Sequence, residues 1–143
     1  DIVCDYDAFG LTVEVTMQSG QRQYETEGEP VTRHLAKYKR ETEKPAYCLF
    51  IAPNINDACK AHFYALHKMN IQYYGGTSTI VPLPLTVFIK MVQDSHNANY
   101  VPEPRHVQRF FERSNELANS TDNEVDWYNG ITHEALNWLP ANV

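Results

Sequence analysis

Two acidic residues near the start of the chain, Asp1 and Glu14, lie in segments that predict a β-hairpin. Apolar and polar residues alternate through residues 2–6 and 11–16, as expected for two strands joined by a turn. When paired residue numbers sum to seventeen, the apolar side chains of both strands share one face, and Asp1 and Glu14 become diagonal neighbours on the other. Their backbones then lie roughly 7–8 Å apart, within joint reach of one cation.

Two carboxylates at this separation suit Mg²⁺, which takes hard oxygen ligands from one or two carboxylates and leaves its other positions to water and substrate phosphate. A metal ion held in this way activates water and stabilises charge on a phosphate, so the pair favours phosphodiester hydrolysis. On spacing alone, a solvated strand face with ordinary surface acids is the simpler explanation.

The chain has the size and composition of one compact domain, with 143 residues of which 43% are hydrophobic. Its longest apolar runs, such as residues 47–53 and 80–85, fall far short of the roughly 20 residues that span a bilayer. The first segment, with Asp1, Asp5 and Asp7, does not resemble a signal peptide. We therefore expect a single soluble domain.

The cysteines, Cys4, Cys48 and Cys59, are odd in number and contain no CxxC pair. Each lies among apolar or helical neighbours, which favours buried thiols in a reducing compartment over a disulfide framework or a zinc site. We therefore expect a cytoplasmic protein.

The formal net charge of −6 argues against a freestanding, high-affinity DNA binder, because neutralising phosphates requires a basic surface. Charge is uneven, however, since half of the twelve Lys and Arg residues fall in one stretch. A local basic face is compatible with this pattern, while another domain or subunit would supply most of the DNA binding. The residues of the stretch are Arg22, Arg33, Lys37, Lys39, Arg40 and Lys44.

The rest of the chain predicts helices that alternate with strands. Residues 29–43 have helical spacing of apolar side chains, with Pro30 in the first turn. Residues 47–52 form a continuous apolar run, typical of a covered central strand. The order of elements predicts an α/β domain with a mixed sheet flanked by helices. The further predicted elements are a helix around residues 58–66, a strand at 78–81, a helix at 85–92 and C-terminal helices around 107–117 and 125–136.

The segment after the hairpin carries a resemblance to a known family. Residues 24–38 read YETEGEPVTRHLAKY, and an aspartate stands thirteen residues before the Glu-Val-Thr run at 14–16. With the apolar strand at 47–53 and the Ile-Val-Pro-Leu run at 80–83, the sequence resembles the AlwI-type family of type IIS restriction and nicking endonucleases. The resemblance extends from Asp1 to about residue 88.

This family is similar to the PD-(D/E)xK nucleases, so the resemblance implies a restriction-endonuclease-like core that cleaves DNA with Mg²⁺, for which Mn²⁺ substitutes. By position, Asp1 is the first acid of the metal site, Glu14 the second, and Glu27 the helix-borne acid of the AlwI-type pattern. Thr16 occupies the position of the usual lysine. These four are the candidate catalytic residues, with the three acids as metal ligands, and the departure at Thr16 leaves open which group handles the attacking water.

Glu27 has a structural alternative. We expect it just before the helix opened by residues 29–30, where a glutamate is stabilised by the helix dipole and could serve only as a capping acid. Glu29 is a weaker candidate for the metal site.

Three residues farther along the same helix are candidates for contacting DNA. Arg33 and His34 are expected near the acids, where Arg33 could bind a phosphate and His34 could do the same or act as an acid or base near neutral pH. A packed, hydrogen-bonded histidine is an equal alternative for His34. Lys37 extends the basic stripe, although a solvated helix face also explains it.

Other residues with reactive side chains give weaker patterns. His62 and His67 with Cys59 lack metal-ligand spacing, and the Gly-Gly pair at 75–76 lacks the lysine of a phosphate loop. Aromatic residues near the C-terminus are expected in the core or an interface. They are Trp127, Tyr128 and Trp138.

We expect residues 1–143 to be a nuclease domain, a fragment of a longer type IIS enzyme whose DNA-recognition region precedes Asp1. Its expected partners are double-stranded DNA, that N-terminal region, and either a transient dimer of nuclease domains or a separate subunit, in the cytoplasm of a prokaryote. The alternative is a degenerate nuclease fold that serves dimerisation or docking without catalysis. The missing lysine motivates this alternative, and the retention of all three acids counts against it.

Overall fold

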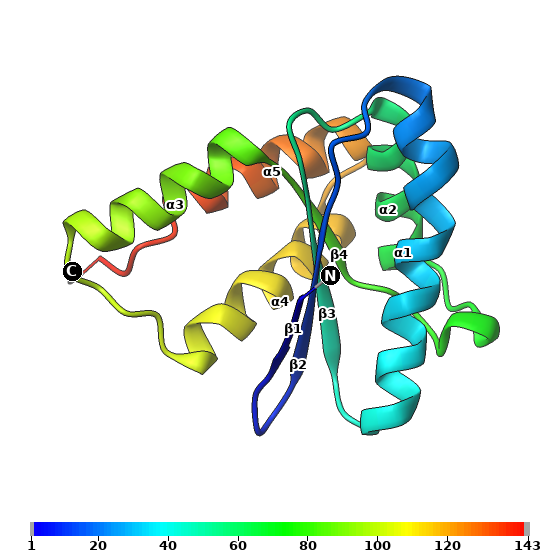
Figure 1. The fold of residues 1–143 in the computed structure, drawn as a ribbon, viewed down its shortest axis with the longest axis horizontal. Coiled ribbons are helices and arrows are strands. Elements are labelled where there is room, and N and C mark those ends of the chain that lie inside the picture. Colours follow the sequence, from blue (N-terminus) through cyan, green and yellow to red (C-terminus); the bar gives the residue numbers. More distant parts are fainter. Residues whose placement is uncertain (1, 142–143) are drawn as a thin grey trace.

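A mixed four-stranded sheet forms the centre of the protein in the computed structural model, which describes residues 2–141 (Figure 1). The strand order is β1-β2-β3-β4, with β1 antiparallel to β2 and the other neighbours parallel. The predicted α/β class with a mixed sheet is confirmed. The strands are β1 (Ile2–Asp5), β2 (Gly10–Val15), β3 (Ala46–Ala52) and β4 (Ile80–Pro84).

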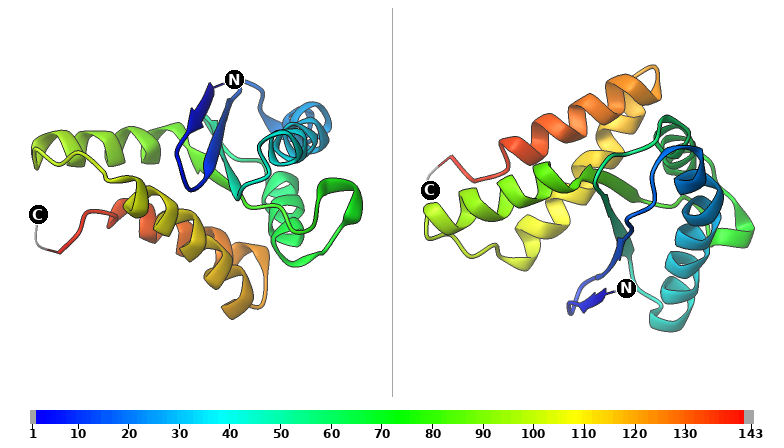
Figure 2. Two further views of the ribbon diagram at one scale, coloured as in Figure 1. Left: turned by 90° about the horizontal axis from the view of Figure 1, so that it is seen from below. Right: turned by 45° about the horizontal axis from the view of Figure 1, so that its top comes forward.

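Helices cover both faces of this sheet. Two helices, α1 and α2, provide the crossovers of the parallel strands and lie on one face, while the three later helices lie on the other, as the views in Figure 2 agree. All the predicted later elements are present with shifted ends. The helices are α1 (Gly20–Thr42), α2 (Asp57–Lys68), the short 3-10 helix η1 (Gln72–Tyr74), α3 (Leu85–Asn97), α4 (Pro104–Ser120) and α5 (Glu124–Leu136).

The centre of the core is β3, in which all seven residues are buried. Its side chains alternate between the two helical layers: the Phe50 ring contacts Phe63 of α2 at 5.2 Å, and the Tyr47 ring stacks on Phe111 of α4 at 5.4 Å. A strand covered on both faces requires a continuous apolar run, so this prediction is confirmed. Trp127 is also fully buried and donates from its indole nitrogen to the Ser114 carbonyl at 3.1 Å, which confirms it as a core residue.

The hairpin has a different register from the predicted one. Ile2 pairs with Val13 and Asp5 with Gly10, so paired numbers sum to fifteen rather than seventeen. A shift of two residues leaves every side chain on its face, and the apolar pattern therefore cannot distinguish the two registers. The turn selects between them, because the Tyr6 N–H donates to the Phe9 carbonyl at 2.9 Å and the buried Phe9 ring stacks on Tyr6.

Helix α1 begins at Gly20, well before the predicted start at residue 29, and Pro30 lies inside it rather than in its first turn. A proline inside a helix cannot donate the backbone hydrogen bond to the residue four positions earlier, here Thr26, and normally ends or kinks the helix. The prediction treated Pro30 as a start signal for this reason, and it was wrong.

Tertiary hydrogen bonds from Gln23 explain why the helix extends so far. Gln23 is fully buried, and its amide nitrogen donates to the carbonyls of Gln18 at 2.9 Å and Asn54 at 2.7 Å. Its amide oxygen accepts from the Asn56 N–H at 2.7 Å. These contacts attach the first turns of α1 to the segments that follow β2 and β3.

The cysteines carry free thiols, of which Cys48 and Cys59 are buried and Cys4 is partly buried. Within residues 2–141, no helix combines the length and the apolar character needed to cross a membrane.

Candidate active site

The acidic face of β2 points toward α1 and is covered by it. Thr12, Glu14 and Thr16 alternate along the strand, and all three are buried, with Glu14 only 7% exposed. The explanation of Glu14 as an ordinary acid on a solvated strand face is therefore wrong. Removing an ionised carboxylate from water is costly unless it has polar partners.

Glu14 finds such a partner in His34 of α1. The distance between Glu14 Oε1 and His34 Nδ1 is 2.9 Å. An ionised carboxylate only accepts hydrogen bonds, so Nδ1 carries the proton and donates it. The alternative of a packed, hydrogen-bonded histidine agrees with this contact in its hydrogen bond, although the His34 side chain is 45% exposed. Its contact with Glu14 leaves Nε2 outside this hydrogen bond.

Thr16 and Glu27 form a second contact between β2 and α1. The Thr16 hydroxyl donates to Glu27 Oε1 at 3.1 Å and accepts from the Gln18 N–H at 3.1 Å. Glu27 lies inside α1, not before it, so its interpretation as a helix-capping acid is also wrong. The side chain that replaces the usual lysine is therefore bonded to one of the candidate metal ligands.

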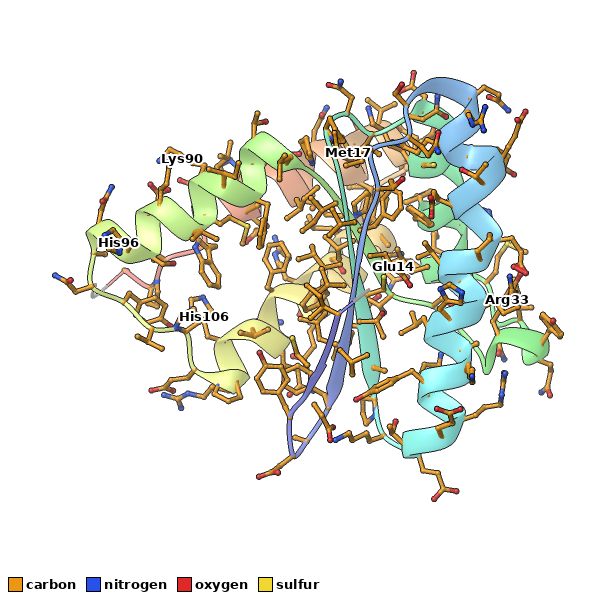
Figure 3. The ribbon with its side chains drawn as sticks, in the orientation of Figure 1. Glu14, Met17, Arg33, Lys90, His96 and His106 are labelled. Carbon is orange, nitrogen blue, oxygen red and sulfur yellow. The ribbon has the colours of Figure 1, made fainter. Side chains whose placement is uncertain are left out.

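The two contacts lie side by side. Glu14 and Thr16 are two residues apart on the same strand face, roughly 6–7 Å along the strand. Their partners His34 and Glu27 are seven residues apart on α1, which is two helical turns or roughly 10 Å. This geometry brings both glutamates to one region between β2 and α1, and Figure 3 shows Glu14 directed toward that helix.

A groove of about 250 Å³ opens beside Glu14, between the β1–β2 hairpin and α1. Its lining combines acidic and basic groups with a larger apolar surface. The lining residues are Ile2, Val3, Thr12, Glu14, His34, Lys37, Tyr38 and Glu41.

Buried thiols lie close to both acids. The pKa of Cys48 is raised to about 12, mainly by burial and to a smaller extent by the charge of Glu14, against a lowering by its hydrogen bond with Thr12. Burial likewise raises the pKa of Cys59 to about 11, with a contribution from Glu27. Both thiols therefore stay protonated at neutral pH, and neither acts as a thiolate ligand or nucleophile.

The donor chemistry of this region fits Mg²⁺. Glu14 and Glu27 both use Oε1 for the contacts described, which leaves Oε2 of each as a hard oxygen ligand of the kind that Mg²⁺ takes from one or two carboxylates. Among residues 2–141, however, no group of three or more His, Cys, Asp or Glu side chains gathers closely enough to hold a metal ion. The first predicted ligand, Asp1, lies outside the described residues, and its predicted spacing from Glu14 depended on the incorrect register.

The predicted DNA-contacting residues lie at different places around α1. Arg33 points away from Glu14 on the outer side of the helix (Figure 3), where its Nε donates to Glu29 at 3.0 Å. Glu29 is therefore on the solvent side, away from the acidic face of β2. Lys37 lines the groove and lies 3.8 Å from Glu41.

Sequence reasoning missed the positions of Tyr38 and Glu41 in the groove. With Glu27 and His34 they follow a spacing of seven, four and three residues, which places all four on one side of a helix. That signal required a helix that includes residue 27, and the late predicted start concealed it. Gln23 was missed because its role depends on segments distant in sequence.

Comparisons with known proteins give a family and a fold. A family model described as AlwI restriction endonuclease matches residues 1–91. No curated protein matches the sequence. The structure is similar to the crystal structure of the small subunit (R.BspD6I2) of the heterodimeric restriction endonuclease R.BspD6I, with a TM-score of 0.72 and 22% identity. The similarity covers 94% of this chain but only 66% of that one, so the chain spans about two thirds of the length of its structural neighbour.

Proposed function

This chain belongs to the AlwI restriction endonuclease family, and we propose that it is a metal-dependent nuclease domain that hydrolyses DNA phosphodiester bonds. Glu14 and Glu27 would hold Mg²⁺, or Mn²⁺ in its place, together with Asp1. Thr16 and His34 would orient the two glutamates.

The observation that carries this proposal is the buried Glu14 carboxylate, bonded to His34 at the edge of an open groove. A buried ion pair is weak evidence for stability, since apolar side chains of similar volume often stabilise a fold equally well. A carboxylate held in a fixed orientation beside a groove is, by contrast, what a metal site needs.

The reaction forms a bond between a water oxygen and phosphorus, breaks the bond from phosphorus to one sugar oxygen, and delivers a proton from the water to that oxygen. A divalent ion lowers the pKa of bound water and neutralises charge on the phosphate. His34 fixes Glu14 through Nδ1, and Thr16 fixes Glu27 through its hydroxyl. His34 also lines the groove, where its ring can contact a bound phosphate.

We further propose that this domain acts within a larger type IIS enzyme in a bacterial cytoplasm. The net charge of −6 supports a separate source of DNA affinity, either a recognition region of the same protein or another subunit. The structural neighbour is the small subunit of a heterodimeric restriction endonuclease, which supports a partner subunit. The basic residues of α1 would contact phosphates rather than bases.

The deciding test is Glu14→Gln, with Glu25→Gln as the matched control because Glu25 is an exposed acid on α1. With Mg²⁺ or Mn²⁺ and a supercoiled plasmid, Glu14→Gln should reduce the cleavage rate by about a thousandfold or more, since a metal site contributes several kcal/mol to transition-state stabilisation. Glu25→Gln should cleave normally. Glutamine keeps the shape and can still accept from His34, so the melting temperature should not fall; retained cleavage in Glu14→Gln would refute the proposal.

A docking module without catalysis is the second candidate function. Thr16 in place of lysine favours it, and so does the role of the structural neighbour as a small subunit. Calorimetry separates the two candidates, because a docking module has no need to bind Mg²⁺ or Mn²⁺. Metal binding that disappears in Glu14→Gln supports the nuclease, whereas absent binding together with absent cleavage supports the docking module.

A further inference from the structure

The groove beside Glu14 contains one permanent positive charge. Among its described lining residues, Lys37 is the one Lys or Arg, while Glu14 and Glu41 contribute negative charge. A phosphodiester that enters this groove would be repelled by both carboxylates. A protein cation at this place would lower that repulsion, in addition to the charge of a bound metal ion.

Lys37 is positioned to meet a phosphate next to Glu14. It follows His34 by three residues, which places it one helical turn away, roughly 4.5 Å along α1. Its flexible four-carbon stem carries a compact ammonium with three donors. Both residues line the same groove, so the ammonium has a short distance to move from Glu41 to a phosphate bound there.

Lys37 is also loosely held. Its nearest acid is Glu41 at 3.8 Å, and the side chains of the two are 70% and 62% exposed. Such a pair is screened by water and yields easily to a charged ligand. The ammonium can therefore change partner without breaking a buried contact.

Neighbouring cations on and after α1 are engaged elsewhere. Arg33 pairs with Glu29 on the outer side of the helix. Lys39 donates to the Thr77 carbonyl at 3.0 Å. Lys44 donates to Asp5 and the Tyr6 carbonyl at the far end of the hairpin.

We propose that Lys37 contacts the scissile phosphate and stabilises the negative charge that builds on it during cleavage. The role rests on the proposed nuclease function. Lys37 supplies a positive charge that is absent at Thr16, because the Thr16 side chain is uncharged and its hydroxyl already donates to Glu27. Lys37 is thereby a catalytic residue, whereas Arg33 is paired with Glu29 on the outer side of α1.

The test compares Lys37→Met with Lys37→Arg and Lys90→Met. Lys90 is a matched control because it also forms an exposed i,i+4 pair, with Asp94, but lies on α3 across the sheet (Figure 3). Two quantities are measured: the cleavage rate of saturating DNA with Mg²⁺, and the affinity for a 20-base-pair duplex in EDTA by fluorescence anisotropy. The second readout does not depend on the metal or on turnover.

Lys37→Met should slow cleavage of saturating DNA by about 10- to 100-fold, the effect of losing one charge-assisted hydrogen bond. Its metal-free affinity should fall by about two- to fivefold. Lys37→Arg should retain most of the rate, and Lys90→Met should match the wild type in both assays.

Two results would overturn the role of Lys37. One is a Lys37→Met protein that cleaves saturating DNA within twofold of the wild-type rate while Glu14→Gln is inactive. The other is an unchanged metal-free affinity in Lys37→Met, since a residue that touches the phosphate must contribute to binding. A wild-type protein that does not cleave at all would overturn the nuclease function itself, and the role of Lys37 with it.

Discussion

Acidification from pH 7.5 to pH 5 should destabilise this protein through one buried side chain, His67 of α2. His67 is 5% exposed, and burial lowers its pKa from 6.5 to about 4. Its Nδ1–H donates to the Phe63 carbonyl at 2.8 Å, and its ring contacts the buried Trp127 ring at 4.7 Å between centroids. The neutral imidazole therefore belongs to the packing of α2 against α4 and α5.

The sign follows from proton binding in the two states. Between about pH 6.5 and pH 4 the unfolded chain binds a proton at His67 and the folded chain does not, so stability is lost as the pH falls through this window and is unaffected above it. With these two pKa values the loss is about 2 kcal/mol at pH 5 and approaches about 3 kcal/mol below pH 4. For a chain of this length, 2 kcal/mol lowers the melting temperature by roughly 5–8 °C.

The assay is urea denaturation at pH 7.5 and pH 5 for wild type, His67→Gln and His133→Gln. His133 is an exposed histidine of α5 and controls for histidine replacement as such. Carboxylates contribute equally to all three proteins, so the difference between their pH dependences isolates His67. His67→Gln should lose about 2 kcal/mol less than wild type on acidification. Parallel pH dependences for wild type and His67→Gln would refute the assignment of a depressed pKa to this histidine.

Two further predictions concern the supports of the site. Thr16→Val should slow cleavage about tenfold, because Glu27 loses its donor, while Thr16→Ser should restore the rate; equal rates for the valine and serine variants would contradict a role for the hydroxyl. Gln23→Leu should lower the free energy of unfolding by about 2–4 kcal/mol in urea denaturation, since three hydrogen bonds to the backbone of Gln18, Asn54 and Asn56 are lost; a loss below about 1 kcal/mol would show that water replaces these bonds.

The sequence predicted the order and type of the elements because their signals are local. The apolar run of β3 and the helical spacing of α2 to α5 are properties of neighbouring residues, and all appear in the structure with shifted ends. The hairpin register and the start of α1 are not local. The first depends on the buried turn residue Phe9, and the second on hydrogen bonds from Gln23 to the segment after β3.

Glu14 and Glu27 were singled out from the sequence as candidate site residues, but their surroundings were not predicted. Alternation along β2 normally means that the polar side faces water. Here α1 covers that side, so Glu14 and Thr16 are buried and bonded to His34 and Glu27. The sequence of residues 10–16 does not indicate that α1 covers this side of the strand. The cover depends on a helix with polar residues at the positions that face the strand.

The discrepancy itself carries information about function. A strand buried on both faces is most stable with apolar side chains on each, as in β3. In β2 the side toward α1 carries two threonines and a glutamate, and the facing positions of α1 carry Glu27 and His34. Polar contacts of this kind contribute little to stability compared with apolar packing. The polar residues between β2 and α1 are therefore not explained by folding alone. Their types support the proposed functional constraint at this site.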